Sequence, residues 1–189
     1  MVINMQQIEI EYKILLTKDI FTQILNDYQN QILHDYIQIN EYYTHPLLQQ
    51  KKYMLRIRTK NNQYELTLKR PINNHRLETN IQLTKEEKDA FTHHQLKNEI
   101  TQILEDEGIA LTELKQQFSL TTHRYDIILP EGTLSLDENT YFNQKDYELE
   151  FEVNNEKAGY KKFLEIIKPY QLNYTHNCPS KIKRVLDSL

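Results

Sequence analysis

Residues 8–14 constrain the fold more than any other stretch, because apolar and charged side chains alternate strictly along them. This period of two is typical of a β-strand and not of a helix. The charged face carries Glu9, Glu11 and Lys13, and neighbours on such a face lie about 6.6 Å apart. Two carboxylates at that spacing can turn toward one divalent cation, or toward two cations about 3.5 to 4 Å apart. The lysine one step further can then meet an anion held by the metal.

Composition limits the class of protein. The chain has 189 residues, which suits one domain over residues 1–189. The formal net charge of -4 and the pI near 6.0 give no basic field, so we expect neither nucleic-acid nor membrane-surface binding. The mean hydropathy is -0.73, no apolar run approaches the roughly 18 residues of a transmembrane helix, and the start lacks the pattern of a signal peptide. We therefore expect a cytoplasmic protein.

Two scarce residue types narrow the chemistry. Cys178 is the one cysteine, which excludes an internal disulfide and a thiolate zinc site, so we expect a buried structural thiol. The three glycines, Gly108, Gly132 and Gly159, form no glycine-rich phosphate-binding loop. A bound phosphate must therefore be held by side chains and metal ions.

Periodicity predicts eight β-strands joined mostly by short connections. They cover residues 8–14, 32–44, 54–60, 63–70, 76–83, 118–129, 133–142 and 147–153. Helical patterns cover residues 17–28, 85–115 (as short helices after a capping-box pattern at Thr84), 156–170 and 181–189. Short connections favour antiparallel neighbours, and eight antiparallel strands suit a closed barrel. We therefore predict an α+β fold: an eight-stranded antiparallel closed β-barrel with helices packed outside.

The polar faces of these strands carry many ionised side chains, and two interpretations are open. The acids are Glu9, Glu11, Glu65, Glu78, Asp137, Glu148, Glu150 and Glu152, and the bases are Lys13, Arg56, Arg58, Lys69 and Arg124. These rows can be the solvated outer faces of ordinary sheets. We favour an inward-facing wet lumen, because the polar faces include rows of a single charge type, such as Glu148, Glu150 and Glu152, and amphipathic helices are available to cover the apolar faces. Unpaired ions are costly to bury, so such a lumen needs divalent cations and a polyanion.

Several short motifs follow one another in the order of a known family. They are Glu9-X-Glu11-X-Lys13, Gln38-X-Asn40-X-Tyr42-Tyr43, Leu55-Arg56-Ile57-Arg58, Glu65-Leu66-Thr67-Leu68-Lys69, Glu78, Thr122-X-Arg124, Asp137, Glu148-X-Glu150-X-Glu152 and Ser180-Lys181. In this order they resemble the blocks of the CYTH superfamily, the triphosphate tunnel metalloenzymes, and the chain looks like the compact CYTH proteins of Gram-positive bacteria. One position departs from the pattern, since Tyr43 is followed by Thr44 where the family often has an aspartate.

The resemblance implies a tunnel in which Mg²⁺ or Mn²⁺ and basic side chains bind a triphosphate. The implied catalytic residues are Glu9, Glu11, Asp137, Glu150 and Glu152. The implied metal ligands are Glu9, Glu11, Glu78, Asp137, Glu150 and Glu152. The implied substrate-binding residues are Lys13, Arg56, Arg58, Glu65, Lys69, Arg124 and Lys181.

The implied activity is metal-dependent hydrolysis of a triphosphate, either inorganic tripolyphosphate or an organic triphosphate. Two alternatives stay open. One is an adenylyl cyclase of the class IV type, in which the same metals orient ATP, and the other is a triphosphate- or polyphosphate-binding protein without catalysis. In each case the partner is a small molecule that contains a triphosphate. The organic part of that molecule and the oligomeric state are not predicted.

Overall fold

The structure, a computed structural model, describes residues 4–188 and divides the chain into two compact units. Unit 1 consists of the residues up to Glu9 together with Gln38–Leu120, and unit 2 consists of Ile10–Ile37 together with the residues from Thr121 onward. Two long strands, β3 (Ile32–Thr44) and β7 (Lys115–Leu129), pass from one unit into the other. The single domain over residues 1–189 stays a prediction.

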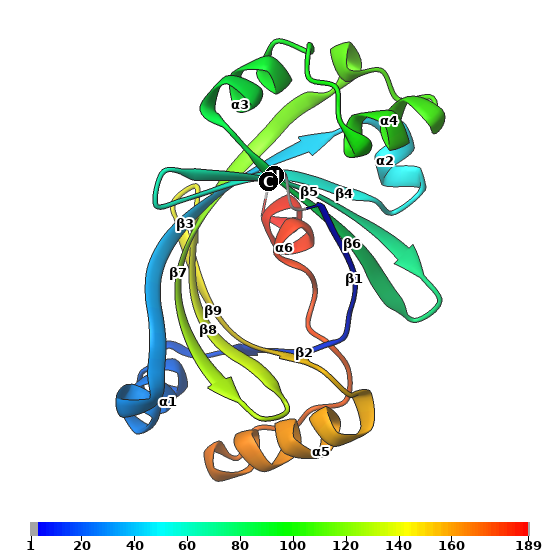
Figure 1. Cartoon of the computed structure of the whole chain (residues 1–189). Coiled ribbons are helices and arrows are strands. Elements are labelled where there is room, and N and C mark those ends of the chain that lie inside the picture. Colours follow the sequence, from blue (N-terminus) through cyan, green and yellow to red (C-terminus); the bar gives the residue numbers. More distant parts are fainter. Residues whose placement is uncertain (1–3, 189) are drawn as a thin grey trace. The chain divides into compact units, whose positions relative to one another are not determined.

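The strands of unit 1 are antiparallel and follow the order β1, β6, β5, β4, β3. β1 spans Asn4–Glu9, β4 spans Met54–Lys60, β5 spans Gln63–Ile72 and β6 spans His75–Leu83 (Figure 1). The turn between β4 and β5 places Asn61 and Asn62 at φ values of 49° and 60°. Asparagine tolerates this left-handed conformation, which matches the twist of a two-residue hairpin, and the predicted hairpin is confirmed.

Helices pack on one face of the unit 1 strands. α2 spans Pro46–Gln50, α3 spans Lys85–Thr92, α4 spans Glu99–Asp106, and a short 3-10 helix, η2, spans Leu111–Glu113. The predicted capping box begins α3, because the Glu87 N–H donates to Thr84 Oγ1 at 3.1 Å while the Thr84 N–H donates to the Glu87 carboxylate at 2.8 Å. The buried core includes Leu55, Ile57, Leu66, Leu68, Ile100 and Leu104. Since alternate residues of β4 and β5 fill this core, the residues between them lie on the opposite face.

Unit 2 has the same plan with different elements. Its strands are antiparallel in the order β7, β8, β9, β2, with β2 spanning Glu11–Leu16, β8 spanning Gly132–Tyr141 and β9 spanning Gln144–Val153. The helices are α1 (Lys18–Tyr28), η1 (Gln29–Gln31), α5 (Glu156–Ile167), η3 (Lys168–Tyr170) and α6 (Lys181–Asp187). α1 and α5 contact β9, and the core joins Phe21, Phe163, Leu149 and Phe151. The other face of β9 is therefore available for its glutamates.

The strand predicted over residues 8–14 is interrupted at Ile10. Up to Glu9 the chain is β1, which pairs with β6, and from Glu11 it is β2, which pairs with β9. Ile8, expected on a buried face, is 57% exposed. The pairing partner changes at this point, and sequence periodicity carries no information about partners. The described part of the chain consequently has nine strands where eight were predicted.

Other boundaries differ by a few residues. Pro71 does not end its strand, because β5 continues to Ile72. The short helix α2 was not predicted; Pro46 occupies its first turn and the His45 ring accepts a hydrogen bond from the Leu47 N–H. On β3 the polar face is the buried one, with Gln38 and Asn40 almost wholly covered. The predicted end of the last helix, at residue 189, lies outside the described residues.

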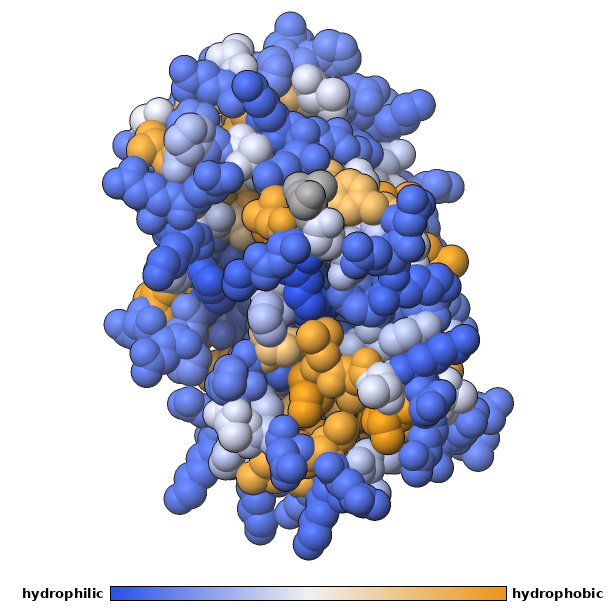
Figure 2. Space-filling model, turned by 180° about the vertical axis from the view of Figure 1, so that it is seen from behind, coloured by the Kyte–Doolittle hydropathy of each residue, from blue (hydrophilic) through white to orange (hydrophobic). Residues whose placement is uncertain are grey.

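The face drawn in Figure 2 is mostly hydrophilic, and apolar side chains are gathered in a few patches. Among the helices within residues 4–188, none has the length and apolar character needed to cross a membrane. The cytoplasmic location stays a prediction.

We expect Gly159→Ala to destabilise the protein. An added Cβ at Gly159 on α5 would lie 2.5 Å from Val153 Cβ and Cγ1 on β9, so the helix would have to move off the strand. Such overpacking costs about 1–3 kcal/mol in the free energy of unfolding. Urea denaturation of the variant beside Lys157→Ala, an exposed position of the same helix, measures the cost. Equal stability of the two variants would contradict the close packing of α5 on β9.

Candidate functional site

Acidic side chains gather on the polar face of β8 and β9 in unit 2. The register places Asp137 of β8 opposite Glu148 of β9, and Glu150 follows two residues later on the same face. Asp137 and Glu148 are 0% exposed. Carboxylates this deeply buried need cationic partners, because leaving water unpaired is strongly unfavourable.

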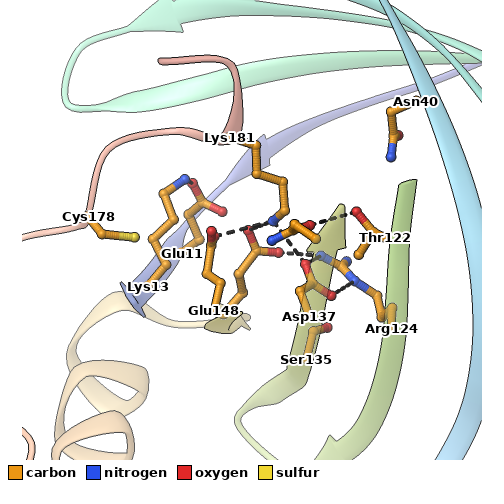
Figure 3. Close-up of polar contacts among 12 residues, drawn as sticks. Glu11, Lys13, Asn40, Thr122, Arg124, Ser135, Asp137, Glu148, Cys178 and Lys181 are labelled. Carbon is orange, nitrogen blue, oxygen red and sulfur yellow. Dashed lines mark hydrogen bonds and ion pairs between the residues drawn. The ribbon is translucent and has the colours of Figure 1, made fainter. Parts of the chain in front are cut away.

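Lys181, the first residue of α6, supplies one such partner. Its Nζ lies 2.6 Å from Glu150 Oε1, 2.9 Å from Asp137 Oδ2 and 3.3 Å from Glu148 Oε1 (Figure 3). Ser180 caps α6 by accepting a hydrogen bond from the Lys183 N–H at 3.3 Å. One ammonium group therefore sits at the point where three carboxylates converge.

Arg124 of β7 holds the same acids from another side. Its Nε and Nη2 donate to the two oxygens of Asp137 at 2.7 and 2.6 Å, and Nη2 also donates to Glu150. A bidentate arginine–carboxylate pair fixes both direction and distance. The orientation of Asp137 is therefore set independently of Lys181.

Glu148 and Glu150 differ in their acidity. Burial raises the pKa of Glu148, which the charge of Glu150 reinforces and Lys181 only partly offsets. Burial also acts on Glu150, but Lys181 and Arg124 outweigh it and hold the pKa of Glu150 well below its usual range. Glu150 is thus the ionised member of the pair and Glu148 is the member that more readily keeps a proton.

Glu11 and Lys13 lie on β2, beside this cluster in the same unit. The Lys13 ammonium donates to the Glu11 carboxylate. Burial alone would lower the pKa of Lys13, but Glu11, Glu150 and Glu148 together raise it. Glu152 is opposite Glu11 in the β2–β9 register and is exposed. Lys13 of β2 and the glutamates of β9 therefore act on one another electrostatically.

Sequence reasoning missed Arg184, which holds Glu148. Arg184 Nε lies 2.8 Å from Asp146 Oδ2, Nη2 contacts Glu148, and Nη1 donates to the Pro179 carbonyl at 2.6 Å. The spacing of Lys181 and Arg184, three residues apart on a predicted helix, was the available signal, because such residues share a helix face.

Asn177 was missed as well. Its Oδ1 accepts from the Lys13 N–H at 2.7 Å and its Nδ2 donates to the Glu11 carbonyl at 2.9 Å, so the side chain binds the backbone of β2. The Cys178 N–H adds a bond to the Lys13 carbonyl at 3.1 Å. Burial, with the charge of Glu148, raises the pKa of the half-buried Cys178 thiol to about 12. The segment before α6 is therefore tied to the strand that carries Glu11 and Lys13.

A second polar cluster belongs to unit 1. Lys69 of β5 contacts Glu9 of β1 and lies 2.7 Å from Glu78 Oε2 of β6, while Arg56 Nη2 of β4 lies 3.9 Å from Glu78 Oε1. Burial would raise the pKa of Glu78, but Lys69 and Arg56 lower it to about 2. Asn80 also donates to Glu78, at 2.9 Å. Glu9, Lys69, Glu78 and Arg56 thus form one group connected by ion pairs.

Arg58 and Glu65 lie further along the same unit. Arg58 Nε donates to Asn40 Oδ1 at 3.1 Å, and its Nη1 lies 3.8 Å from Glu65 Oε1. Glu65 also accepts from Gln82 at 2.8 Å. Buried Arg56 Nε has no hydrogen-bond partner among the described protein atoms, so its N–H can still donate a hydrogen bond to a ligand oxygen.

The structure therefore places the predicted residues in two groups, each within one unit. Unit 1 holds Glu9, Arg56, Arg58, Glu65, Lys69 and Glu78, and unit 2 holds Glu11, Lys13, Arg124, Asp137, Glu150, Glu152 and Lys181. Between residues 4 and 188, no three His, Cys, Asp or Glu side chains approach one another closely enough to hold a metal ion as they stand. The catalytic, metal-binding and substrate-binding roles of these residues stay predictions.

The family is decided by a comparison with family models. The model described as the CYTH domain matches residues 7–177. The chain belongs to the CYTH domain family. The resemblance inferred from the motifs is thereby confirmed.

Relatives of this CYTH domain agree with that assignment. YjbK of Bacillus subtilis (strain 168), a candidate triphosphatase by its name, is 34% identical over 169 residues, which are 88% of each chain. The crystal structure of a candidate adenylate cyclase from Bacillus halodurans is 32% identical, with a TM-score of 0.86 over 95% of this chain and 97% of that one. HpAC1 from Hippeastrum, described as a candidate adenylyl cyclase with a dominant triphosphatase activity, is 18% identical with a TM-score of 0.77, covering 97% and 96% of the two chains, and shows the fold alone. The predicted antiparallel β fold with helices outside is confirmed.

We expect acid to weaken the unit 1 cluster in a defined pH window. The pKa of Glu78 is about 2 in the folded protein against an ordinary 4.5, so its contribution to stability is present above about pH 4.5 and is lost as the pH falls toward 2. Glu78→Gln should be less stable than the natural protein at pH 7, and the difference should shrink between pH 5 and pH 2, as measured by urea denaturation.

The control is Glu105→Gln, which removes one exposed negative charge from α4. If the difference in stability between Glu78→Gln and the natural protein stays constant from pH 7 to pH 2, then Lys69 and Arg56 do not stabilise the ionised form of the Glu78 carboxylate.

Proposed function

We propose that this CYTH domain is a divalent-metal-dependent triphosphatase, which hydrolyses inorganic tripolyphosphate or an organic triphosphate. The observation that carries the proposal is the buried cluster of Asp137, Glu148 and Glu150 with Lys181 and Arg124. A cluster that combines acids able to bind metal with cations able to bind phosphate suits a substrate of high negative charge. The likeness to YjbK supports the same assignment.

The residues present fit a divalent cation. Carboxylate oxygens are the ligands that Mg²⁺ and Mn²⁺ prefer, and the ammonium of Lys181 already occupies a cation position among three of them. Asp137 and Glu150 would hold the metal there, and Glu11 and Glu152 of the same unit complete the predicted set. Glu9 and Glu78 keep their predicted role as ligands, and Mg²⁺ and Mn²⁺ are both candidates. A cation bound to these carboxylates would supply Lewis-acid polarisation of phosphoryl oxygens.

The basic residues of the chain would position the substrate and stabilise its negative charge. Phosphoryl transfer needs a positioned substrate and positive charge where the leaving oxygen becomes negative. Arg124, fixed on Asp137, presents a guanidinium in one orientation, and Lys13 and Lys181 carry ammonium groups on flexible side chains that can reach the phosphate chain. Arg56, Arg58 and Lys69 keep their predicted role in binding phosphoryl oxygens.

An adenylyl cyclase is the second candidate, and one observation favours it. The relative from Bacillus halodurans, which shares 32% identity and nearly the whole length, is named as a candidate adenylate cyclase. The two reactions differ in the phosphorus atom that is attacked, so their products distinguish them: free phosphate for the triphosphatase and cyclic AMP for the cyclase. Binding of triphosphate without either product would identify a binding protein.

We expect the purified protein to release phosphate from tripolyphosphate or ATP in the presence of Mg²⁺ or Mn²⁺, and to lose this activity with EDTA. Malachite-green detection of phosphate and chromatography for cyclic AMP measure both reactions in one incubation. Turnover that persists in EDTA would contradict a metal-dependent reaction, and cyclic AMP as the main product would replace the proposal by its alternative.

We expect Glu150→Gln and Glu11→Gln each to lower metal-dependent turnover by about 100-fold or more, because each removes a charge that the metal needs while keeping the side-chain shape. Glu11→Gln should leave the fold intact or more stable, since it relieves crowding among the carboxylates. Circular dichroism and thermal melting check the fold, and Glu165→Gln on the surface of α5 is the control for one lost charge. A Glu150→Gln variant with natural turnover would remove Glu150 from the site.

A further inference from the structure

We propose that Lys181 is an exchangeable counter-cation: its ammonium holds the carboxylates of unit 2 in the metal-free protein, yields that position to the divalent metal, and then turns to the phosphate chain. The inference rests on the proposed function and adds how this site changes between its empty and loaded states. Lys181 lies outside residues 7–177, the range matched by the family model.

The first support is the geometry around Nζ. Three carboxylates from two strands, Asp137 of β8 and Glu148 and Glu150 of β9, place an oxygen within 2.6 to 3.3 Å of one nitrogen atom. A surface ion pair commonly has one partner, whereas this ammonium is surrounded by three carboxylates, the type of ligand that a divalent metal prefers. Lys181 is the first residue of α6, and Figure 3 shows its side chain pointing down toward Asp137 and Glu148.

The second support is that arginines hold the same acids, and on Glu148 and Glu150 they use the oxygen that Lys181 does not. Arg124 binds both oxygens of Asp137 and also Glu150 Oε2, whereas Lys181 binds Glu150 Oε1. Arg184 binds Glu148 Oε2, whereas Lys181 binds Glu148 Oε1. If Lys181 leaves, each carboxylate keeps an arginine that fixes its direction, and Glu148 Oε1 and Glu150 Oε1, which faced the ammonium, become available to another cation.

The third support is the nature of the side chain. Arginine forms planar, directional pairs, while lysine carries a point charge on four flexible carbons and donates in any of three directions. The ammonium can therefore move while the backbone of α6 stays anchored by Arg184 on Asp146 and Pro179. The metal and the ammonium then compete for the same oxygens. Loss of Lys181 must therefore strengthen the binding of the metal and weaken the binding of the triphosphate.

The test is Lys181→Met, with Mn²⁺ binding measured in the absence of any triphosphate by calorimetry and by electron paramagnetic resonance. We expect Mn²⁺ to bind about tenfold tighter or better, because the metal no longer displaces a like charge from the acids. We expect tripolyphosphate, measured on the Mn²⁺-loaded protein, to bind about tenfold more weakly, because a phosphate-binding cation is lost. Mn²⁺ affinity that is unchanged or weaker in Lys181→Met would overturn the inference.

Two further variants keep the test decisive. Lys183→Gln removes an exposed charge from the same helix and should leave both affinities unchanged. Lys181→Arg keeps the positive charge among the acids and should therefore leave Mn²⁺ affinity much closer to the natural value than Lys181→Met does. If Lys181→Met is too unstable to study, Lys181→Gln serves in its place, and a larger rise in melting temperature with Mn²⁺ than in the natural protein is the supporting result.

The inference and the proposed function can fail separately. Tighter Mn²⁺ binding in Lys181→Met, in a protein that hydrolyses no triphosphate, would support the counter-cation role and contradict the triphosphatase. Natural triphosphatase activity with the same Mn²⁺ affinity in both proteins would contradict the counter-cation role alone.

Discussion

Carboxylates removed from water, which need cationic partners, are the constraint on which the rest of this structure depends. Asp137, Glu148 and Glu150 lie on strands whose other face packs against helices, so they cannot turn away from the position that the strand period gives them. Their charge is tolerated because Lys181, Arg124 and Arg184 meet them from outside β8 and β9. The loop before α6, the cap at Ser180 and the side chain of Asn177 follow from this need, since they bring those cations to the acids.

In unit 1, other residues balance the charge of the carboxylates. Glu9 and Glu78 share the ammonium of Lys69, and Arg56 stands beside Glu78, so acids of β1 and β6 face cations of β4 and β5. In both units a lysine ammonium lies between carboxylates from different strands, and an arginine supports the same carboxylates. This arrangement suits a protein whose acids exchange one cation for another, and in which displaced lysines are available to an anionic substrate.

Much of this could be predicted from the sequence because local rules decide it. The alternation of residues 147–153 identified β9 and its buried Leu149 and Phe151, and the Asn61–Asn62 turn identified the hairpin. The motifs identified the family and most charged residues of both clusters. The match to the family model confirms the family, and the roles of the charged residues stay predictions.

The rest depended on contacts between distant parts of the chain. Periodicity gives the faces of a strand but not its neighbour, so the interruption at Ile10 could not be foreseen. Periodicity also does not say which face of a strand is buried. On β3 the buried face is the polar one. Arg184 and Asn177 act through residues more than thirty positions away, and only the fold brings them together.

A crystal structure with Mn²⁺ and a non-hydrolysable triphosphate analogue would test the central relation between acids, metal and lysine most directly. We expect an anomalous peak for Mn²⁺ at about 2.1 Å from carboxylate oxygens of Glu150 and Asp137, with Lys181 Nζ moved onto a phosphoryl oxygen. A structure in which Mn²⁺ lies away from these carboxylates, while Lys181 still contacts Asp137, Glu148 and Glu150, would contradict it.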